Sequence, residues 1–460
     1  MTSNAHLLAG ALAANGDALT SGTIYVAGRP RVEVATRNGF AGGWSVRQLT
    51  GALNGGTSPV SAINDADAAV VLWRAPGNSV QSSVRASRTG VWRTLAVPSG
   101  AVARSSDGFL TPSAAMNAKG QATVAWAAHE QQGWAVRSAF RSGTNAIWRA
   151  TPALLPTAPA GSTLGTIAVR TNAAGDAIAA WSTSAGTSTV YVALRTAHKA
   201  WGPPTAIGTM AETGMVAWGA PPSVSIAPNG RVALAWAFNT MSDPTQSHVA
   251  VATGSALTGH ISTPTTIATG VAPSIAINNA GALAAAWAVA EDSGFYTVTQ
   301  DAAVAADGTT WTTPQVLDTV GSNSELYFGH VALAESGRAF AYWSVHVGPG
   351  ARTAAVESAG ADGVWTGFSR NQETDTTLAL NGLGDALALT SAYDPPVPQT
   401  IANSYDAAQR VTHAQWVWLR SVYIPAHFAP ALRATVWTRL TSNTSATLAL
   451  VRRYAPASIR

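Results

Sequence analysis

The 460-residue chain contains no cysteine, and charged residues make up only 11% of it. The absence of cysteine excludes disulfides, thiolate nucleophiles and cysteine-ligated zinc or iron–sulfur centres. Its longest apolar run, from Ala282 to Ala290, falls well short of the roughly 18–20 residues that a membrane-spanning helix requires. A hydrophobic content of 47% argues against a disordered chain. We therefore expect a folded protein without a transmembrane segment.

Basic residues are concentrated at one end. Seven arginines and no acidic residue follow Asp406, although the formal net charge of the whole chain is only +4. This end could contact a polyanion such as nucleic acid, teichoic acid or an anionic membrane, but nothing in it resembles a specific nucleic-acid-binding module. Alternatively, the arginines lie on the outer face of a closing hairpin, because Arg433–Leu440 and Ala446–Arg453 both fit strands. We interpret residues 420–460 as a separate tail, either a closing hairpin or a docking segment.

One phrase recurs along the rest of the chain: a short apolar strand, a turn rich in Asn, Gly and Asp, and an alternating Ala/Val run that ends in Trp. Six complete copies place this Trp six residues beyond the turn anchor, at Trp73, Trp126, Trp181, Trp236, Trp287 and Trp343. Two degenerate copies flank them, so the anchors lie at 16, 67, 120, 175, 230, 281, 337 and 384. A second Trp closes most units, and the two positions together hold 13 of the 17 tryptophans.

Each unit has room for four strands. In the fourth unit they are Thr166–Arg170, Asp176–Ser182, Val190–Thr196 and a strand that begins near Trp201. The Asn-Ala-Ala-Gly turn after the first strand supplies the positive φ of a tight hairpin. Four strands at this period predict propeller blades, with each Trp filling the wedge between neighbouring sheets. We predict an all-β propeller over residues 1–419 with eight four-stranded blades, or seven if a terminal unit pairs differently, and a C-terminal β-hairpin tail.

The run Asn-Ala-Ala-Gly-Asp-Ala-Ile-Ala-Ala-Trp from Asn172, followed by Trp201-Gly-Pro-Pro, resembles propeller repeats of secreted actinobacterial proteins of unassigned role. The turns Asp307–Trp311 and Asp362–Trp365 are similar to the Asp-box of sialidase-type propellers, although they depart from its Ser-x-Asp-x-Gly-x-x-Trp spacing. The resemblance covers about 410 residues. It implies a propeller in a secreted or cell-surface bacterial protein, and an Asp-box is structural, so it implies no activity.

Patterns that would indicate catalysis are sparse. The sequence has no Gly-x-Ser-x-Gly, no His-Glu-x-x-His and no phosphate-binding glycine loop. It contains only eight glutamates, and its arginines show no assignment to a sialidase-like triad. The carboxylates of Asp65 and Asp67 have a spacing that can share a calcium ion, although a plain turn is favoured. We therefore expect no catalytic residue, no metal and no cofactor.

The candidate ligand site lies on the face where the loops between second and third strands gather with the loops between units. These loops vary most along the chain, whereas the turns between first and second strands stay uniform. Trp134 and Trp218, which the repeat does not explain, could stack on a sugar ring or anchor a protein, or could pack under their own loops. The candidate ligand-binding residues are Trp134, Trp218, Tyr327, His129, Glu130, Asp243 and Asp292.

These features predict a non-catalytic extracellular binding protein that recognises a carbohydrate or a protein partner through its loop-bearing face. One alternative is a polysaccharide-active hydrolase or lyase, which requires at least two acidic, Tyr, His or Arg groups that converge in the central funnel. The other is a structural subunit of a surface or particle assembly, in which the basic tail docks to a neighbour.

Overall fold

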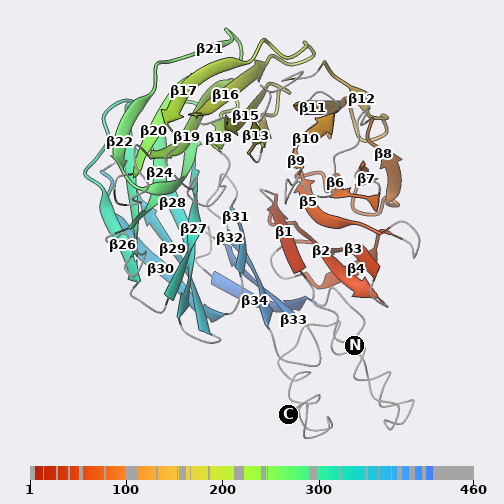
Figure 1. The fold of residues 1–460 in the computed structure, drawn as a ribbon. Helices are drawn as coiled ribbons and strands as arrows, with labels where there is room; N and C mark the ends of the chain where they lie inside the picture. Colours follow the sequence, from red (N-terminus) through yellow and green to blue (C-terminus); the bar gives the residue numbers. More distant parts are fainter. Residues whose placement is uncertain are drawn as a thin grey trace, which may run out of the picture.

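In the computed structural model, all the described strands belong to antiparallel sheets (Figure 1). It describes residues 6–417 with gaps in the connections, the longest at 99–111, 155–161, 212–221 and 291–297. Because small, β-branched and aromatic residues alternate with a period of two, each repeat folds into strands that bury residues on both faces. The all-β prediction, with four-stranded antiparallel sheets, is confirmed.

The described strands form eight sheets, each made from consecutive strands. Sheet 1 contains β1 (His6–Leu12), β2 (Ala18–Val26), β3 (Arg29–Arg37) and β4 (Trp44–Gln48). Sheet 2 contains β5 (Thr57–Ile63), β6 (Ala69–Arg74), β7 (Val80–Arg85) and β8 (Arg93–Ala96). Sheet 3 contains β9 (Ser113–Met116), β10 (Ala122–Glu130), β11 (Gly133–Arg141) and β12 (Arg149–Ala150). Sheet 4 contains β13 (Thr163–Leu164), β14 (Ala168–Thr171), β15 (Ala177–Ser184), β16 (Thr187–Arg195) and β17 (Thr205–Ala211).

The second half of the chain repeats this order. Sheet 5 contains β18 (Ser223–Ile226), β19 (Arg231–Asn239), β20 (Ser247–Ser255), β21 (His260–Ile261) and β22 (Thr265–Thr269). Sheet 6 contains β23 (Val271–Ile277), β24 (Leu283–Ala290), β25 (Val298–Ala305) and β26 (Gln315–Val320). Sheet 7 contains β27 (Ser324–Leu333), β28 (Ala339–Val347), β29 (Ala351–Ala359) and β30 (Trp365–Glu373). Sheet 8 contains β31 (Thr376–Leu380), β32 (Ala386–Ala392), β33 (Gln399–Asp406) and β34 (Val411–Val417).

The two five-stranded sheets are four-stranded sheets in which one edge strand is split. In sheet 4, β13 and β14 both pair with β15, and in sheet 5, β21 and β22 both pair with β20. The last strand of sheet 4 begins at Thr205 rather than near Trp201. Pro203 and Pro204 explain this difference, because proline has no N–H to donate to the ladder.

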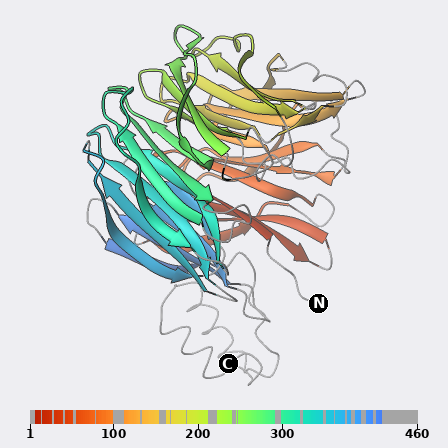
Figure 2. The same cartoon turned by 60° about the vertical axis from the view of Figure 1, so that its left-hand side comes forward.

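The sheets lie around a common axis, with the first strand of each sheet nearest the centre (Figure 1). Neighbouring sheets pack face to face (Figure 2), through contacts such as β1 with β5, β5 with β9 and β23 with β27. Strand β1 also packs against β31 and β32, so the first and last sheets are neighbours. The described strands therefore close a ring.

The turns between first and second strands share one backbone feature. Seven of the eight anchors have positive φ, between 60° and 100°: Gly16, Asp67, Gly120, Gly175, Gly230, Gly281 and Gly337. Gly384 lies outside the described residues. Glycine adopts this conformation without steric cost, whereas Asp67 requires compensation from its surroundings. The positive φ predicted for the Asn-Ala-Ala-Gly turn is confirmed at Gly175, and the other six anchors share it. The end of the ring where these turns lie is called the turn face below.

The core consists of clusters that join neighbouring sheets. The repeat tryptophans Trp73, Trp126, Trp181, Trp236, Trp287 and Trp343 are all buried, and each packs with apolar residues of the preceding sheet. Trp73, for example, clusters with Leu19 and Val32 of sheet 1. A β-carbon built on Gly56 would lie 2.1 Å from the Trp73 ring, so the connection before β5 needs glycine there.

Two segments that carry candidate ligand residues of the expected loops are strand instead. His129 and Glu130 belong to β10, and only residues 131–132 separate β10 from β11. Tyr327 lies in β27, where the pairing with β28 shifts register between Tyr327 and His330. The segment of β27 keeps its backbone pairing with β28, and the register shift between Tyr327 and His330 accommodates the extra residue there.

Candidate functional site

A cavity of about 660 Å³ occupies the centre of the ring on the side of the turn face. Its walls are the last few residues of the first strands of sheets 1 to 7, and Pro228 and Glu335 of two turns also line it. Because the first strands lie nearest the axis, each of these seven sheets contributes only a few residues here. The cavity size suits a small ligand or the end of a chain molecule.

Serine side chains connect the strands that surround the cavity. Ser223 and Ser225 of β18 accept hydrogen bonds from the N–H groups of Ile275 and Ile277 in β23, at 3.1 and 3.2 Å. Ser274 of β23 accepts a bond from the Val331 N–H in β27, at 3.0 Å. Because each of these hydroxyl oxygens acts as an acceptor, its proton stays available for donation. The wall therefore presents hydroxyl donors to whatever enters.

Two basic side chains, Arg170 of β14 and His330 of β27, line the cavity from different sheets. Both side chains are exposed to the cavity, although the surrounding strands crowd them closely enough to affect their ionisation. Burial, with a smaller contribution from the positive charge of Arg170, lowers the pKa of His330 to about 4. Burial also lowers the pKa of Arg170. At neutral pH the cavity thus holds a guanidinium cation and a neutral imidazole, together with the Glu335 side chain, whose Oε2 accepts a hydrogen bond from the Asn279 N–H at 3.1 Å.

The cavity opens among turns that are tied together by asparagine side chains. Asn172 accepts hydrogen bonds at Oδ1 from the N–H groups of Gly175 and Asp176, and its Nδ2 donates to the carbonyl groups of Ala227 and Pro228 in the next turn. Asn64 links the turns of sheets 2 and 3 in the same way, and Asn278 links those of sheets 6 and 7. The rim of the cavity is therefore a set of mutually bonded turns.

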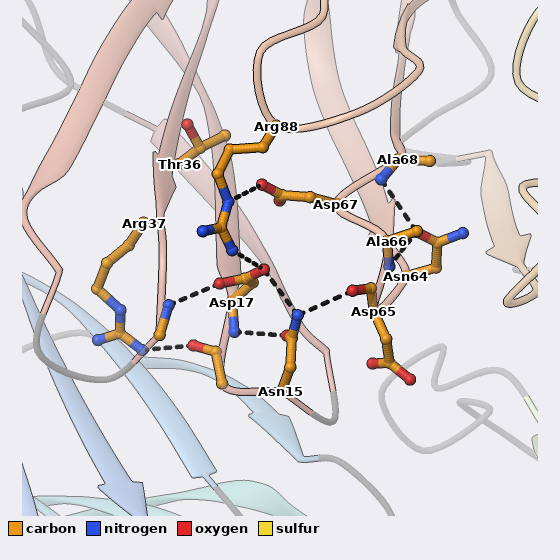
Figure 3. A network of polar contacts seen from close by, with 12 residues as sticks. Asn15, Asp17, Thr36, Arg37, Asn64, Asp65, Ala66, Asp67, Ala68 and Arg88 are labelled. Carbon is orange, nitrogen blue, oxygen red and sulfur yellow. Dashed lines mark hydrogen bonds and ion pairs between the residues drawn. The ribbon is translucent and has the colours of Figure 1, made fainter.

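An ionic network strengthens this rim between sheets 1 and 2 (Figure 3). Arg88 donates to Asp17 at 2.8 Å and to Asp67 at 3.0 Å, and Arg85 donates to the other oxygen of Asp67 at 2.7 Å. Asp17 and Asp67 are buried. Both oxygens of Asp67 thus pair with guanidinium groups, which compensates for its positive φ and gives the turn, considered from sequence as a calcium site, a structural role.

The predicted ligand residues lie elsewhere or outside the described residues. His129 and Glu130 end β10, and Trp134 pairs with His129 across the hairpin. This hairpin lies at the opposite end of β10 from the turn face, about 25–30 Å away at the rise of a strand. Trp134 is partly buried against the core cluster that contains Ala127 and Leu154. Tyr327 lies in strand β27. The other three candidates, Trp218, Asp243 and Asp292, lie outside the described residues.

Sequence reasoning missed Arg170 and His330. Both were visible as basic residues within strands otherwise made of small and apolar residues. Their proximity could not be read from the chain, because 160 residues separate them and only the circular arrangement of sheets places both at the axis. Arg170 and His330 both line the central cavity.

The described part of the chain offers no group of three or more His, Asp or Glu side chains that could hold a metal ion. Among the same residues, no helix has the length and hydrophobicity needed to cross a lipid bilayer. The tail at 420–460, with its expected hairpin, lies outside the described residues.

No protein-family model matches the sequence, and no curated protein matches it. Similar solved structures include an ulvan lyase bound to a saccharide of GlcA and Rha3S, which is 12% identical, with 79% of this chain and 93% of that chain covered and a TM-score of 0.47. The BP39L lectin from Burkholderia pseudomallei is 15% identical, with 78% and 97% covered and a TM-score of 0.46. An α-L-arabinanase from Penicillium chrysogenum is 10% identical, with 69% and 85% covered and a TM-score of 0.37. These are β-propeller-like folds, and similarity at this level assigns no ligand or activity to the chain.

Proposed function

We propose that this chain is a non-catalytic binding propeller of eight blades that receives an acidic or sulfated saccharide in its central cavity. The observation that carries the proposal is the position of Arg170 and His330, which line one cavity from two sheets. A guanidinium group can form two parallel hydrogen bonds with one carboxylate or sulfate group. The neutral imidazole and the serine hydroxyls supply further hydrogen-bond donors.

The dimensions of the cavity favour a saccharide over a folded protein partner. About 660 Å³ accommodates one or two sugar rings, and the encircling first strands exclude a protein surface. The hydroxyl donors of Ser223, Ser225 and Ser274 suit a ligand rich in oxygen acceptors. A secreted or cell-surface location, as the resemblance to secreted repeat proteins implies, would expose the cavity to such polymers.

The test is a binding assay with matched ligands and matched variants. Oligosaccharides that contain uronate or sulfate groups are compared with neutral oligosaccharides of the same length, on a glycan array and then by calorimetry. We expect binding of the anionic set, weakened about tenfold or more in Arg170→Gln, because a charged hydrogen-bonding partner is removed. Arg231→Gln removes the same charge from an exposed position outside the cavity and should leave binding unchanged.

Two results would refute the proposal: equal binding of neutral and anionic saccharides, or equal losses in the Arg170 and Arg231 variants. If the anionic saccharides bind selectively but this binding is lost in Trp134→Ala, the binding site lies on the loop-bearing face, as the sequence predicts. Binding of an acidic protein without any glycan signal would favour a protein partner or an assembly role, with the basic tail as its docking segment.

A second candidate, a polysaccharide lyase, is favoured by one specific observation. His330 is neutral at physiological pH and shares its cavity with the Arg170 cation. Elimination from a uronate requires a base that removes the proton beside the carboxylate and a cation that stabilises the charge developing there. Here the C–H electron pair would form the new C=C bond, and the glycosidic C–O bond would break with its electrons on the leaving oxygen.

Ultraviolet absorbance distinguishes the two candidates, because elimination leaves an unsaturated uronate whereas binding does not. A lyase predicts a steady rise in absorbance that is abolished in His330→Gln while binding is retained. No rise with any bound uronate oligosaccharide leaves the non-catalytic binding function as the conclusion.

A further inference from the structure

The two halves of the ring carry opposite charge. Residues 1–211, which contain sheets 1 to 4, include 16 basic and seven acidic residues. Residues 212–406, which contain sheets 5 to 7 and most of sheet 8, include four basic and 16 acidic residues. The small net charge of the whole chain therefore hides a strong separation of charge across the ring, which favours attraction between unlike regions of different molecules.

Exposed apolar side chains gather at two places on this ring. Six large hydrophobic side chains are exposed among the described residues, and four of them lie in or beside the turns between third and fourth strands in two pairs of neighbouring sheets. In sheets 2 and 3 they are Val91 and Ile147, which are 67% and 69% exposed. In sheets 6 and 7 they are Val316 and Val364, which are 52% and 57% exposed. Apolar groups that gather on a surface among charged groups are typical of an interaction site.

The exposed apolar residues of sheets 2 and 3 are accompanied by arginines. A hydrogen bond of 3.1 Å from the Arg93 guanidinium to the Asn145 side-chain oxygen joins the turns of the two sheets. Segments 86–96 and 142–150 contain no acidic residue. Two exposed arginines, each two residues beyond an exposed aliphatic side chain, complete what is called the basic patch below: Val91, Arg93, Ile147 and Arg149.

The exposed apolar residues of sheets 6 and 7 are accompanied by carboxylates. The Gln315 side chain accepts a hydrogen bond from the Trp365 N–H at 3.0 Å and donates one to the Trp365 carbonyl at 3.1 Å, so the two sheets are joined here as well. Segments 305–316 and 360–366 contain no basic residue. Two exposed aspartates and the two valines form what is called the acidic patch below: Asp307, Val316, Asp362 and Val364.

We propose that the basic patch binds the acidic patch of a second copy of this chain. Each patch presents two aliphatic side chains and two charges of one sign, so contact between unlike patches buries the aliphatic groups and pairs the charges. Contact between like patches would bring equal charges together, which selects the unlike pairing.

The positions of the patches require two molecules for this contact. Strands β8 and β12, beside the basic patch, lie across the ring from β26 and β30, beside the acidic patch (Figure 1). One copy therefore cannot pair its own patches, and the contact is heterologous, joining different surfaces of two copies. None of the eight patch residues lines the central cavity, so this association is separate from saccharide binding there.

The experiment measures the mass of the full chain by sedimentation over a range of protein and salt concentrations. We expect the wild-type mass to rise with protein concentration and the association to weaken with added salt. A basic-patch variant with Arg93→Glu and Arg149→Glu should associate about tenfold or more weakly, because like charges then meet. Arg47→Glu with Lys199→Glu makes the same change of net charge at exposed positions outside both patches, and should associate like the wild type.

Mixing two variants separates a specific contact from a general effect of charge or misfolding. An acidic-patch variant with Asp307→Lys and Asp362→Lys should also associate weakly alone. An equimolar mixture of the basic-patch and acidic-patch variants should associate again, because the unaltered acidic patch of the first meets the unaltered basic patch of the second, and the two reversed patches also match.

Three results would overturn the proposal. The first is a wild-type chain that stays monomeric at every concentration, including one that instead sediments with anionic lipid vesicles, which would assign the basic patch to a membrane surface. The second is an equal loss of association in the basic-patch variant and its Arg47 and Lys199 control. The third is a mixture of the two reversed variants that remains monomeric.

Discussion

Asn172 offers a sharp test of how the turns of neighbouring sheets hold the ring together. Its amide group donates to Asp176, Ala227 and Pro228 and accepts from Gly175 and Asp176, over distances of 2.9 to 3.2 Å. Each buried hydrogen bond contributes about 0.5–1.5 kcal/mol net, and some of the backbone groups keep a second partner. We therefore expect Asn172→Ala to lower the free energy of unfolding by about 2–4 kcal/mol.

Asn229 is the matched control, because it makes similar bonds at the same face but is exposed. It donates to the carbonyl of Asn279 at 2.7 Å and accepts from the Arg231 N–H at 3.1 Å. Water can replace both bonds, so Asn229→Ala should cost less than about 1 kcal/mol. Asn172→Asp adds a second test. It keeps the acceptor oxygen but places a carboxylate against Asp176, so its loss at neutral pH should partly recover in acid.

The measurement is urea-induced unfolding followed by tryptophan fluorescence, with differences taken from midpoints at a constant denaturant slope. The 17 tryptophans give a strong signal. Equal losses for the Asn172 and Asn229 alanine variants would refute the reasoning, because burial would then make no difference. An Asn172→Asp variant as stable as wild type at neutral pH would refute the assigned direction of the amide.

Three further predictions concern acid stability, packing and the loop-bearing face. Folding lowers the pKa of His330 from about 6.5 to about 4, so the unfolded chain binds more protons than the folded chain between these pH values. The free energy of unfolding should therefore fall as the pH drops from about 6.5 to about 4. In His330→Gln this fall should be smaller, as measured by urea unfolding at a series of pH values. Gly56→Ala should lower the free energy of unfolding by about 1–3 kcal/mol, because the new β-carbon clashes with the Trp73 ring. Gly143→Ala is the control: no atom lies within 4 Å of its new β-carbon, so the same urea assay should show a change of less than about 0.5 kcal/mol. Trp134→Ala should lower the unfolding temperature, because the ring packs on a core cluster, and leave saccharide binding in the cavity intact by calorimetry; an unchanged unfolding temperature with lost binding would contradict this.

Local chemistry made much of the fold predictable, whereas the cavity depends on long-range geometry. Anchors such as Gly175 can be recognised because positive φ leaves few residue choices, and the strands of unit four follow from alternation. Arg170 and His330 escaped prediction because a period of two does not say which strand faces the axis. The pairing of Tyr327 in a strand also went unrecognised, because a shift in register hides the alternation. All seven candidate ligand residues stay predictions, and three of them, Trp218, Asp243 and Asp292, lie outside the described residues.

Among the described strands, the ring closes without any strand being shared between its first and last sheets. Every described sheet consists of consecutive strands, so β1 meets β31 and β32 through packing and not through a ladder of backbone hydrogen bonds. This junction resembles the others along the circle, so the starting point of the polypeptide is topologically arbitrary. Circularly permuted variants that begin between two other sheets should therefore fold, and the seam beside β1 should separate first under mechanical load.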